Sequence, residues 1–461
     1  MTLSLERRAA LWGDRTAVVD ASADRRVSYA DLDSETDAMA RKLSALGVGP
    51  GDTVAVLSRN RVETLALFFA VRRLGGVFAP ISHRLTPATV EGPLNAVDPE
   101  VVVHEAAQRD LVRELPDERT HSFEELGRDD GEEYKRTDRD PDESLLYLHT
   151  KAETDRRVVG EDAVEHGSTT PRSQTHEDEE RERRDESLSE GATEATRVVD
   201  FPARAVEWNC ITAAAAWGLG RDDCAPSLLP FSDADGLLGL TLPLLYVGGR
   251  VALLRAFSPA DALAAVAEEG ASALFAGATE YRELVAGDEF AATDFDGVEW
   301  IATRSALPAD AREELARRAP VVRTYGRVET GPNNLFVPPE IEERAQGVRN
   351  VPGAHKAAKA PDADRVGRPV PDCEVRVAGD DGTPLAEGEV GELRFRGAVT
   401  PRGYLERDGG DDATEAFPEW VPSGDLGYRE GGDYYLLGDA GELDRAALRR
   451  QLSGEERFDG E

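Results

Sequence analysis

The chain has 461 residues, 40% of them hydrophobic, which is enough for about three domain-sized units with substantial cores. Its 90 acidic and 54 basic residues give a net charge of −36, and a field of that sign repels nucleic acids and anionic membrane surfaces. No apolar run approaches the ~20 residues of a membrane span, and the N-terminus lacks the pattern of a signal peptide. We therefore expect neither a nucleic-acid-binding protein nor one with a membrane span.

The basic residues include only five lysines, and the acidic residues are spread along the whole chain. An acidic, arginine-rich surface stays hydrated in concentrated salt, where screening confines electrostatic forces to short distances. We infer a halophilic protein from a salt-loving source of haloarchaeal type, because an acidic binding tail would concentrate the charge in one segment. The cysteines Cys210, Cys224 and Cys373 form neither a metal-ligand spacing nor an even disulfide set, so we expect a cytoplasmic protein.

In chain order, apolar strands alternate with helices in the first part of the sequence. The expected elements are a helix over 3–11, strands over 16–20 and 27–29, a helix over 29–46, a strand over 54–57, a helix over 61–74 and a strand over 77–81. Strands separated by helices of about a dozen residues favour a parallel sheet of the α/β class.

The same rhythm returns after residue 200. The expected helices cover 204–218, 237–245, 259–268, 279–286 and 309–319, and the expected strands cover 227–230, 250–254, 273–275, 300–302 and 321–325. Beyond residue 367 the pattern changes to strands, at 373–377 and 389–396, with glycine-bearing turns between them. The sequence thus predicts a second α/β unit followed by a small sheet or barrel.

Between residues 160 and 197 the composition becomes strongly polar, with an unbroken charged run at 177–186. Glu and Arg residues four apart in that run could support a transient helix, but the segment has no apolar face to pack. We interpret it as a disordered, acidic insertion; the alternative is a docking tail for a partner.

Five blocks of the sequence carry a family resemblance. They are 324–329 (Thr-Tyr-Gly-Arg-Val-Glu), 366–371 (Val-Gly-Arg-Pro-Val-Pro), 388–393 (Gly-Glu-Val-Gly-Glu-Leu), 402–404 (Arg-Gly-Tyr) and 423–427 (Ser-Gly-Asp-Leu-Gly). In this order and spacing the chain resembles the adenylate-forming superfamily of acyl-CoA synthetases and related AMP-dependent ligases. The resemblance implies an α/β fold, with the two stacked α/β subdomains of that family's large N-terminal domain plus a small β-barrel-like subdomain.

The resemblance also implies a chemistry. In that family a carboxylate, such as a fatty acid, attacks ATP to give an acyl-adenylate and pyrophosphate, and CoA then takes the acyl group, with Mg²⁺ at the site. Tyr325, in the same motif as Gly326, matches the aromatic that stacks on adenine. Glu329 matches the acid that holds Mg²⁺, which prefers oxygen ligands, and Asp425 matches the acid that accepts the ribose hydroxyls. The alternatives are a core aromatic at a strand end for Tyr325 and a turn residue for Asp425.

The chain departs from the family where the phosphates would bind. A phosphate loop needs small residues, so that backbone N–H groups can reach the anion, but residues 145–159 contain Glu153 and Asp155 at that place. Arg156 alone keeps the charge of the family's lysine, which leaves Arg156 and Glu329 as the candidates for catalysis. The motif threonine is Val328, which has no hydroxyl to donate to a phosphate.

Two further departures concern the rest of the pocket. The family's Gly-Gly-Ala-Pro reads Thr-Arg-Ser-Ala at 303–306, which puts Arg304 into space that the backbone and adenine would share. Asp233 stands at the position of an expected histidine. Asp439 lies near that of the arginine before the hinge, and no lysine follows Lys359. We therefore expect the family's mobile C-terminal domain to be missing.

These patterns divide the chain into an N-terminal α/β subdomain (1–150), a segment with the altered phosphate loop and the insertion (151–200), a second α/β subdomain (201–360), a small β subdomain (361–437) and a remnant of the hinge (438–461). Two hypotheses remain open. The first is a member with impaired catalysis, either a pseudoenzyme or a nucleotide- or acyl-binding subunit. The second is an active acyl-CoA ligase whose C-terminal domain comes from another chain.

Overall fold

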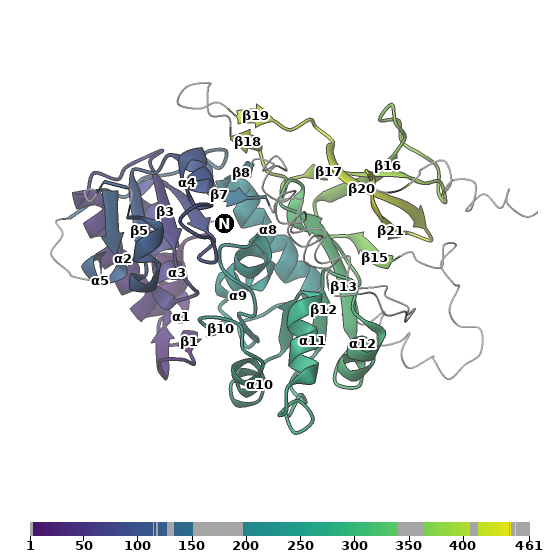
Figure 1. Ribbon diagram of the computed structural model, residues 1–461, viewed down its shortest axis with the longest axis horizontal. Helices are drawn as coiled ribbons and strands as arrows, with labels where there is room; N and C mark the ends of the chain where they lie inside the picture. Colours follow the sequence, from purple (N-terminus) through teal and green to yellow (C-terminus); the bar gives the residue numbers. More distant parts are fainter. Residues whose placement is uncertain are drawn as a thin grey trace, which may run out of the picture.

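The computed structural model describes residues 3–113, 115–116, 119–126, 133–150, 197–339, 364–405 and 414–441, together with Leu443 and Leu448. The altered phosphate loop beyond residue 150, with Arg156, and the predicted insertion up to residue 196 lie outside these described residues. The remaining elements form three sheets with helices packed between and around them (Figure 1).

An eight-stranded sheet forms the first unit, with the order β19-β18-β8-β7-β4-β3-β5-β6. Its strands are β3 (Thr53–Leu57), β4 (Val77–Ile81), β5 (Val101–His104), β6 (Thr120–Ser122), β7 (Ser144–His149), β8 (Val198–Pro202), β18 (Gly403–Leu405) and β19 (Thr414–Ala416). The five strands from β7 to β6 are parallel, and β3 is buried along its whole length, as expected for a parallel sheet covered on both faces.

Helices cover this sheet, and capping residues in the local sequence determine where they begin and end. They are α1 (Leu5–Trp12), α2 (Tyr29–Ala45), α3 (Val62–Leu74), α4 (Glu91–Val97), the 3-10 turn η1 (Ala106–Leu111) and α5 (Phe123–Leu126). Helix α2 begins with a capping box, in which the Ser28 side chain and the Asp31 side chain each bond the other residue's backbone N–H. Helix α3 ends at Gly75, whose φ of 82° favours glycine.

A four-stranded sheet ties the N-terminus to the second unit. It has the order β2-β1-β10-β9, formed by β1 (Thr16–Asp20), β2 (Arg25–Ser28), β9 (Cys224–Pro226) and β10 (Arg250–Leu253). Strands β1, β10 and β9 are parallel although more than 200 residues separate β1 from β9 in the sequence. The two α/β units therefore share a sheet.

The third sheet has nine strands in the order β11-β12-β13-β14-β15-β21-β20-β17-β16. The strands are β11 (Ala273–Ala276), β12 (Trp300–Thr303), β13 (Val321–Arg327), β14 (Gly331–Phe336), β15 (Asp364–Pro369), β16 (Cys373–Ala378), β17 (Gly391–Gly397), β20 (Val421–Glu430) and β21 (Asp433–Asp439). The first three are parallel and the rest antiparallel, so the predicted β-rich part continues the sheet of the second α/β unit.

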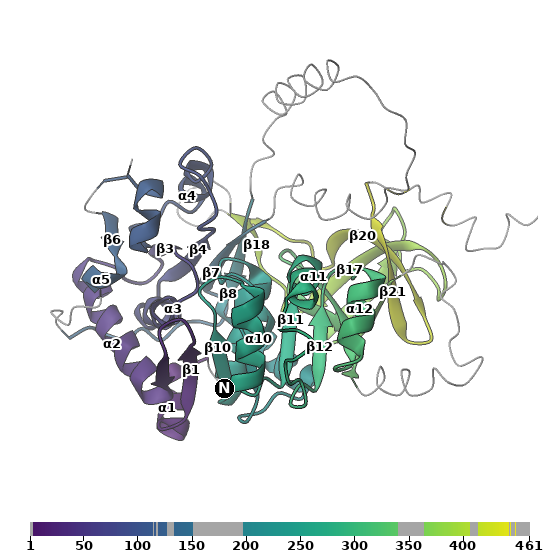
Figure 2. The same ribbon diagram turned by 60° about the horizontal axis from the view of Figure 1, so that its bottom comes forward.

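The helices of the second unit lie on both sides of its strands. They are α8 (Ala203–Trp217), the π-helix η4 (Asp235–Thr241), α9 (Leu242–Val247), α10 (Pro259–Glu268), α11 (Ala278–Ala286) and α12 (Ala309–Ala316). Figure 2 shows α10, α11 and α12 side by side along β11 and β12. The α/β class predicted from the alternation of strands and helices is confirmed.

Two predicted elements differ from the structure. The strand expected at 227–230 is instead β9 at Cys224–Pro226, and the chain leaves it through a turn in which the Leu228 N–H bonds the Pro226 carbonyl. The helix expected at 237–245 starts earlier, as the wider turns of η4, where the Thr241 hydroxyl donates to the Gly236 carbonyl. Both differences arise around residues 226–236, where the sequence carries two prolines and several polar residues.

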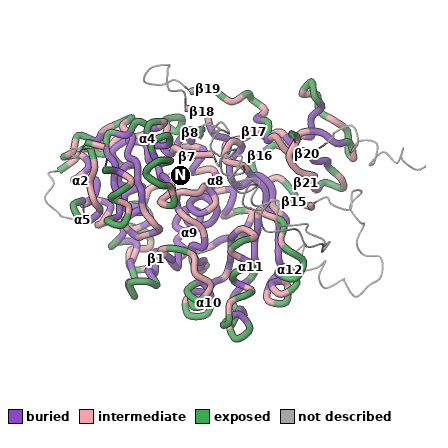
Figure 3. Tube along the Cα trace, viewed as in Figure 1, coloured by how far each residue is buried: buried purple, intermediate pink, exposed green. Residues whose placement is uncertain are grey.

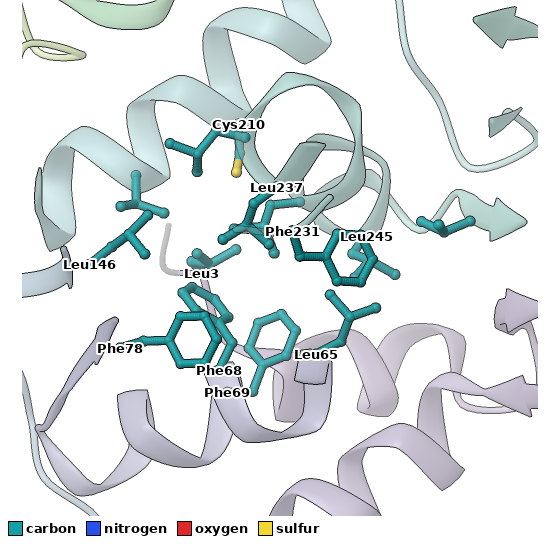
Figure 4. Packing of buried hydrophobic residues seen from close by; sticks show 14 of the residues in the cluster. Leu3, Leu65, Phe68, Phe69, Phe78, Leu146, Cys210, Phe231, Leu237 and Leu245 are labelled. Atoms are coloured by element: carbon teal, nitrogen blue, oxygen red, sulfur yellow. The ribbon is translucent and has the colours of Figure 1, made fainter. Parts of the chain in front are cut away.

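The largest core lies between the two units. Helix α3 has eleven of its thirteen residues buried, so it is covered on all sides rather than on one stripe. Figure 4 shows its Leu65, Phe68 and Phe69 facing side chains of the second unit, including Cys210 and Leu237. Burial is concentrated along these inner elements, whereas the outer helix faces and loops are exposed (Figure 3). None of the helices in the described ranges is long and apolar enough to cross a membrane.

The Asn60 side chain links the segment after β3 to the second unit through two hydrogen bonds. Its side chain is 4% exposed, its Nδ2 donates to the Leu229 carbonyl at 2.9 Å, and its Oδ1 accepts from the Phe231 N–H at 2.8 Å. We expect Asn60→Ala to lower the free energy of unfolding by about 2–4 kcal/mol, because one buried and one partly buried backbone group lose their partners. Urea unfolding measures this; Asn95→Ala, at an exposed position of α4, is the control and should change it by less than about 0.5 kcal/mol. Equal effects of the two substitutions would contradict the prediction.

Candidate functional site

The candidate site lies at the carboxyl ends of the parallel strands β11, β12 and β13, where ligands bind in open α/β sheets. Tyr325, Gly326 and Arg327 end β13, and Glu329 follows in the turn to β14. Asp425 reaches them from β20, which lies in the part of the same sheet drawn in yellow in Figure 1. The structure thus brings together the four residues predicted to bind nucleotide and metal.

Tyr325 is buried, with 5% of its surface exposed, and its ring stacks on Phe395 at a centroid distance of 5.6 Å. Its hydroxyl donates to Asp425 Oδ2 at 2.6 Å. Burial raises the pKa of Tyr325 well above its usual value, and the nearby charge of Asp425 adds to the rise. The ring therefore belongs to the core of the β-rich part, as in the alternative that the sequence left open, while its hydroxyl faces the site.

Arg327 lies between the two acids of the site. Its Nη1 is 3.0 Å from Asp425 Oδ2 and its Nε is 4.0 Å from Glu329 Oε2. The Tyr404 hydroxyl donates to the other Glu329 oxygen, Oε1, at 3.3 Å. We call Tyr325, Arg327, Glu329, Tyr404 and Asp425 the Arg327 cluster.

The charges of the Arg327 cluster reinforce one another. Burial is the largest single influence and lowers the pKa of Arg327, but the charges of Asp425, Tyr325 and Glu329 and the hydrogen bond to Asp425 together raise that pKa overall. Burial, followed by the charge of Glu329, raises the pKa of Tyr404 to about 12. The guanidinium therefore stays charged, and both acids face a cation supplied by the chain itself.

Arg304 makes a second closed arrangement beside the first. Its Nε donates to Asp235 Oδ2 at 2.8 Å, and its Nη2 lies 2.5 Å from Asp235 Oδ1 in the same ion pair. Its Nη1 donates to the Gly326 carbonyl at 2.9 Å, and its guanidinium carbon lies 5.5 Å from the centre of the Phe275 ring. We call this side chain with its contacts to Asp235 and Gly326 the Arg304 bridge; it spans the carboxyl ends of β11, β12 and β13.

Gly326 can only be glycine in this geometry. A Cβ atom there would lie 2.3 Å from the Pro332 carbonyl oxygen and 2.5 Å from that of Gly331, both on the neighbouring strand β14. Glycine thus allows β13 to approach the backbone of β14 closely at this position, and the Gly326 carbonyl accepts a hydrogen bond from Arg304.

The other predicted positions have simpler environments. Val328 is partly buried and packs against the main core, so it offers the site no polar group. Asp439 pairs with Asp425 across β20 and β21, and its Oδ1 accepts from the Gly441 N–H. Asp233 accepts the Asp235 N–H, which leaves Asp235 as the acid that meets Arg304.

The residues do not fit an adenosine nucleotide with Mg²⁺ as they stand. The acid matched to the ribose already bonds Tyr325 and Arg327, and the acid matched to Mg²⁺ faces Arg327 and Tyr404. Mg²⁺ binds through carboxylate oxygens that offer negative charge, which an adjacent guanidinium offsets. Across the described ranges, no group of three or more His, Cys, Asp and Glu side chains is arranged to hold a metal ion.

Sequence reasoning missed two residues of the site, Arg327 and Asp235. The block 324–329 gives Arg327 no role in the sequence, although residues two apart on a strand share a face and Tyr325 is assigned to the site. Asp235 has no clear signal in the sequence, because it meets Arg304 at the start of the π-helix η4.

Comparison with known proteins gives the chain's relatives. The family profile described as "AMP-binding enzyme" matches residues 5–185 and 199–405. An indoleacetate–CoA ligase from Aromatoleum aromaticum is 26% identical over 447 residues, which cover 93% of this chain and 76% of the relative. A feruloyl-CoA synthase from Amycolatopsis is 27% identical over 423 residues, covering 90% and 73%.

Solved structures show the same fold. The inhibitor-bound N-terminal domain of FACL13 from Mycobacterium tuberculosis superposes with a TM-score of 0.73 at 20% identity, covering 94% of this chain and 98% of that one. The o-succinylbenzoate CoA synthetase of Bacillus subtilis, in complex with the acyl-adenylate intermediate OSB-AMP, gives a TM-score of 0.74 at 20% identity, covering 96% and 79%.

Proposed function

Because the chain belongs to the AMP-binding enzyme family, we propose that it is an acyl-CoA ligase-like pseudoenzyme, which has kept the fold of these ligases but does not form acyl-adenylates. Its curated relatives named above are CoA ligases, and ATP, Mg²⁺, CoA and a carboxylate are the ligands that such chemistry would use. We further propose a cytoplasmic, halophilic protein, in keeping with three unpaired cysteines and a net charge of −36.

The observation that carries the proposal is the position of Arg327 between Asp425 and Glu329. Adenylation brings together a carboxylate and a phosphate, both anionic, so the site must place positive charge and donors around the reacting phosphate. Here Arg327 is instead held by the two acids. The motif position between Arg327 and Glu329 is Val328, which cannot donate a hydrogen bond.

The altered loop at 145–159 supports the same proposal from the sequence. Glu153 and Asp155 would oppose a pyrophosphate, and Arg156 is the one residue that keeps the charge expected there. Because losing a single charge-stabilising donor costs an enzyme about 10²- to 10³-fold in rate, several such losses together leave little adenylation.

We expect no carboxylate-dependent release of pyrophosphate from ATP. The measurement uses the whole chain in multimolar KCl with a panel of aromatic and aliphatic carboxylates, and compares the chain with its Asp425→Ala variant. The two should release pyrophosphate equally slowly, at the rate without protein.

Release by the unsubstituted chain that disappears in Asp425→Ala would overturn the proposal. Release that appears only after a separate, lysine-bearing C-terminal domain is added would support the alternative, a ligase completed by a second chain.

A further inference from the structure

We infer that Arg304 and Arg327 act as internal ligands, whose guanidinium groups exclude adenine nucleotides from the site. This inference rests on the function proposed above and names the residues that set the specificity of the same site. It concerns binding, whereas the proposed function concerns turnover, so this inference can fail while the proposed function stands.

The first part of the inference comes from the charges of the Arg327 cluster. Asp425, Glu329 and Arg327 have side chains that are 13%, 13% and 16% exposed, so solvent screens their contacts only weakly. The Tyr325 hydroxyl and Arg327 both contact the Oδ2 atom of Asp425. A ribose that approached this carboxylate would have to compete with a charge-assisted contact that is already made.

The second part comes from the Arg304 bridge. Both Arg304 and Asp235 have side chains 18% exposed, and the three contacts of the guanidinium fix its plane between Asp235 and the Gly326 carbonyl. That carbonyl directly follows Tyr325, the residue matched to adenine stacking. A planar base entering here would meet a planar guanidinium that is held in place on two sides.

Each of the two arginines has a carboxylate partner. Such pairing is not expected if the site had only lost its functional residues at random. A buried arginine without a carboxylate partner is strongly destabilising, so each arginine needs the acid that it meets. Arg304 meets Asp235 from another segment of the chain, about 70 residues away, and Arg327 meets Asp425 about 100 residues away. Charge compensation at both places indicates a site that is maintained in a closed, folded form.

Shortening the two arginines should therefore open the site. The probe is AMP, whose binding is measured by calorimetry in multimolar KCl with the full chain, Arg304→Gly, Arg327→Met and the double variant. The control is Arg365→Met, because Arg365 also makes a two-contact ion pair, with Asp433 of the same sheet, but outside the site. Arg327→Lys keeps the positive charge and tests whether charge alone closes the site.

We expect weak AMP binding by the unsubstituted chain and by Arg365→Met, and binding about 10- to 100-fold tighter for each single variant, since a contact of this kind is worth one to two factors of ten. Arg327→Lys should stay close to the unsubstituted chain. Thermal unfolding confirms that each variant is folded before its binding is compared.

Equal AMP affinity in the unsubstituted chain and in a folded single variant would overturn the inference, and so would AMP binding by the unsubstituted chain as tight as by the variants. If the double variant does not fold, the single variants decide. A gain in AMP binding without pyrophosphate release supports both proposals. Equal AMP affinity without pyrophosphate release overturns this inference alone, whereas pyrophosphate release by the unsubstituted chain overturns both, because ATP must enter the site to react.

Discussion

Transfer from about 3 M to about 0.1 M KCl is expected to remove most of the stability of this protein, about 5 kcal/mol or more. The net charge of −36 is spread over the whole chain, and its self-repulsion acts over a Debye length of about 10 Å at 0.1 M salt but only about 3 Å at 1 M. Because folding brings these charges together, the compact state loses most when screening weakens.

Surface ion pairs do not reverse this expectation. Arg317 contacts Glu313 and Glu314, and Arg396 contacts Glu374 and Glu419, all on exposed surfaces. Weaker screening strengthens such pairs, but each contributes only about 0–1 kcal/mol. The excess of 36 negative charges has no such partners, so repulsion dominates at low salt.

The measurement is the thermal midpoint and the urea midpoint at both KCl concentrations. Sucrose at matched osmolality and low salt is the control, because excluded solutes also stabilise folded proteins. A midpoint that is unchanged or higher at low salt would contradict the prediction, and with it the inferred adaptation to salt. Full recovery in sucrose alone would show that solute exclusion, not screening, is the cause.

Much of the fold follows from local pattern. The buried strands β3 and β4 and the apolar middle of helix α3 are visible as apolar runs between glycine turns, and the parallel pairing follows from their alternation. The pairing of β1 with β10 could not be predicted, because both are short apolar strands and their register depends on how two distant units pack.

The sequence predicts which motif residues lie in the candidate site, but it does not predict the contacts that their side chains make. Tyr325, Glu329 and Asp425 lie together as the resemblance implied. What Arg327 and Arg304 do there depends on which acids the fold brings within reach of a long side chain. Motif comparison alone gives Arg304 as a departure and Arg327 no role, whereas the structure pairs each with a carboxylate.

Asp235→Ala is expected to lower the free energy of unfolding by about 3 kcal/mol, because it leaves the largely buried Arg304 guanidinium without its carboxylate partner. If the unpaired charge of Arg304 causes this loss, removing that charge should restore part of the stability. The double variant Asp235→Ala with Arg304→Gly should therefore be more stable than Asp235→Ala alone. The coupling between the two positions should reach about 2 kcal/mol, as expected for residues in direct contact.

Urea unfolding in multimolar KCl of the unsubstituted chain, both single variants and the double variant measures this coupling. Asp381→Ala is the control, since Asp381 is an acid of an exposed turn that accepts from Thr383, and it should show no coupling to Arg304→Gly. Additive losses at positions 235 and 304 would mean that the Arg304 bridge does not stabilise the chain. Strong coupling would mean that the arginine which closes the site is also part of what holds the fold together, so that a site opened by mutation is also a weakened one.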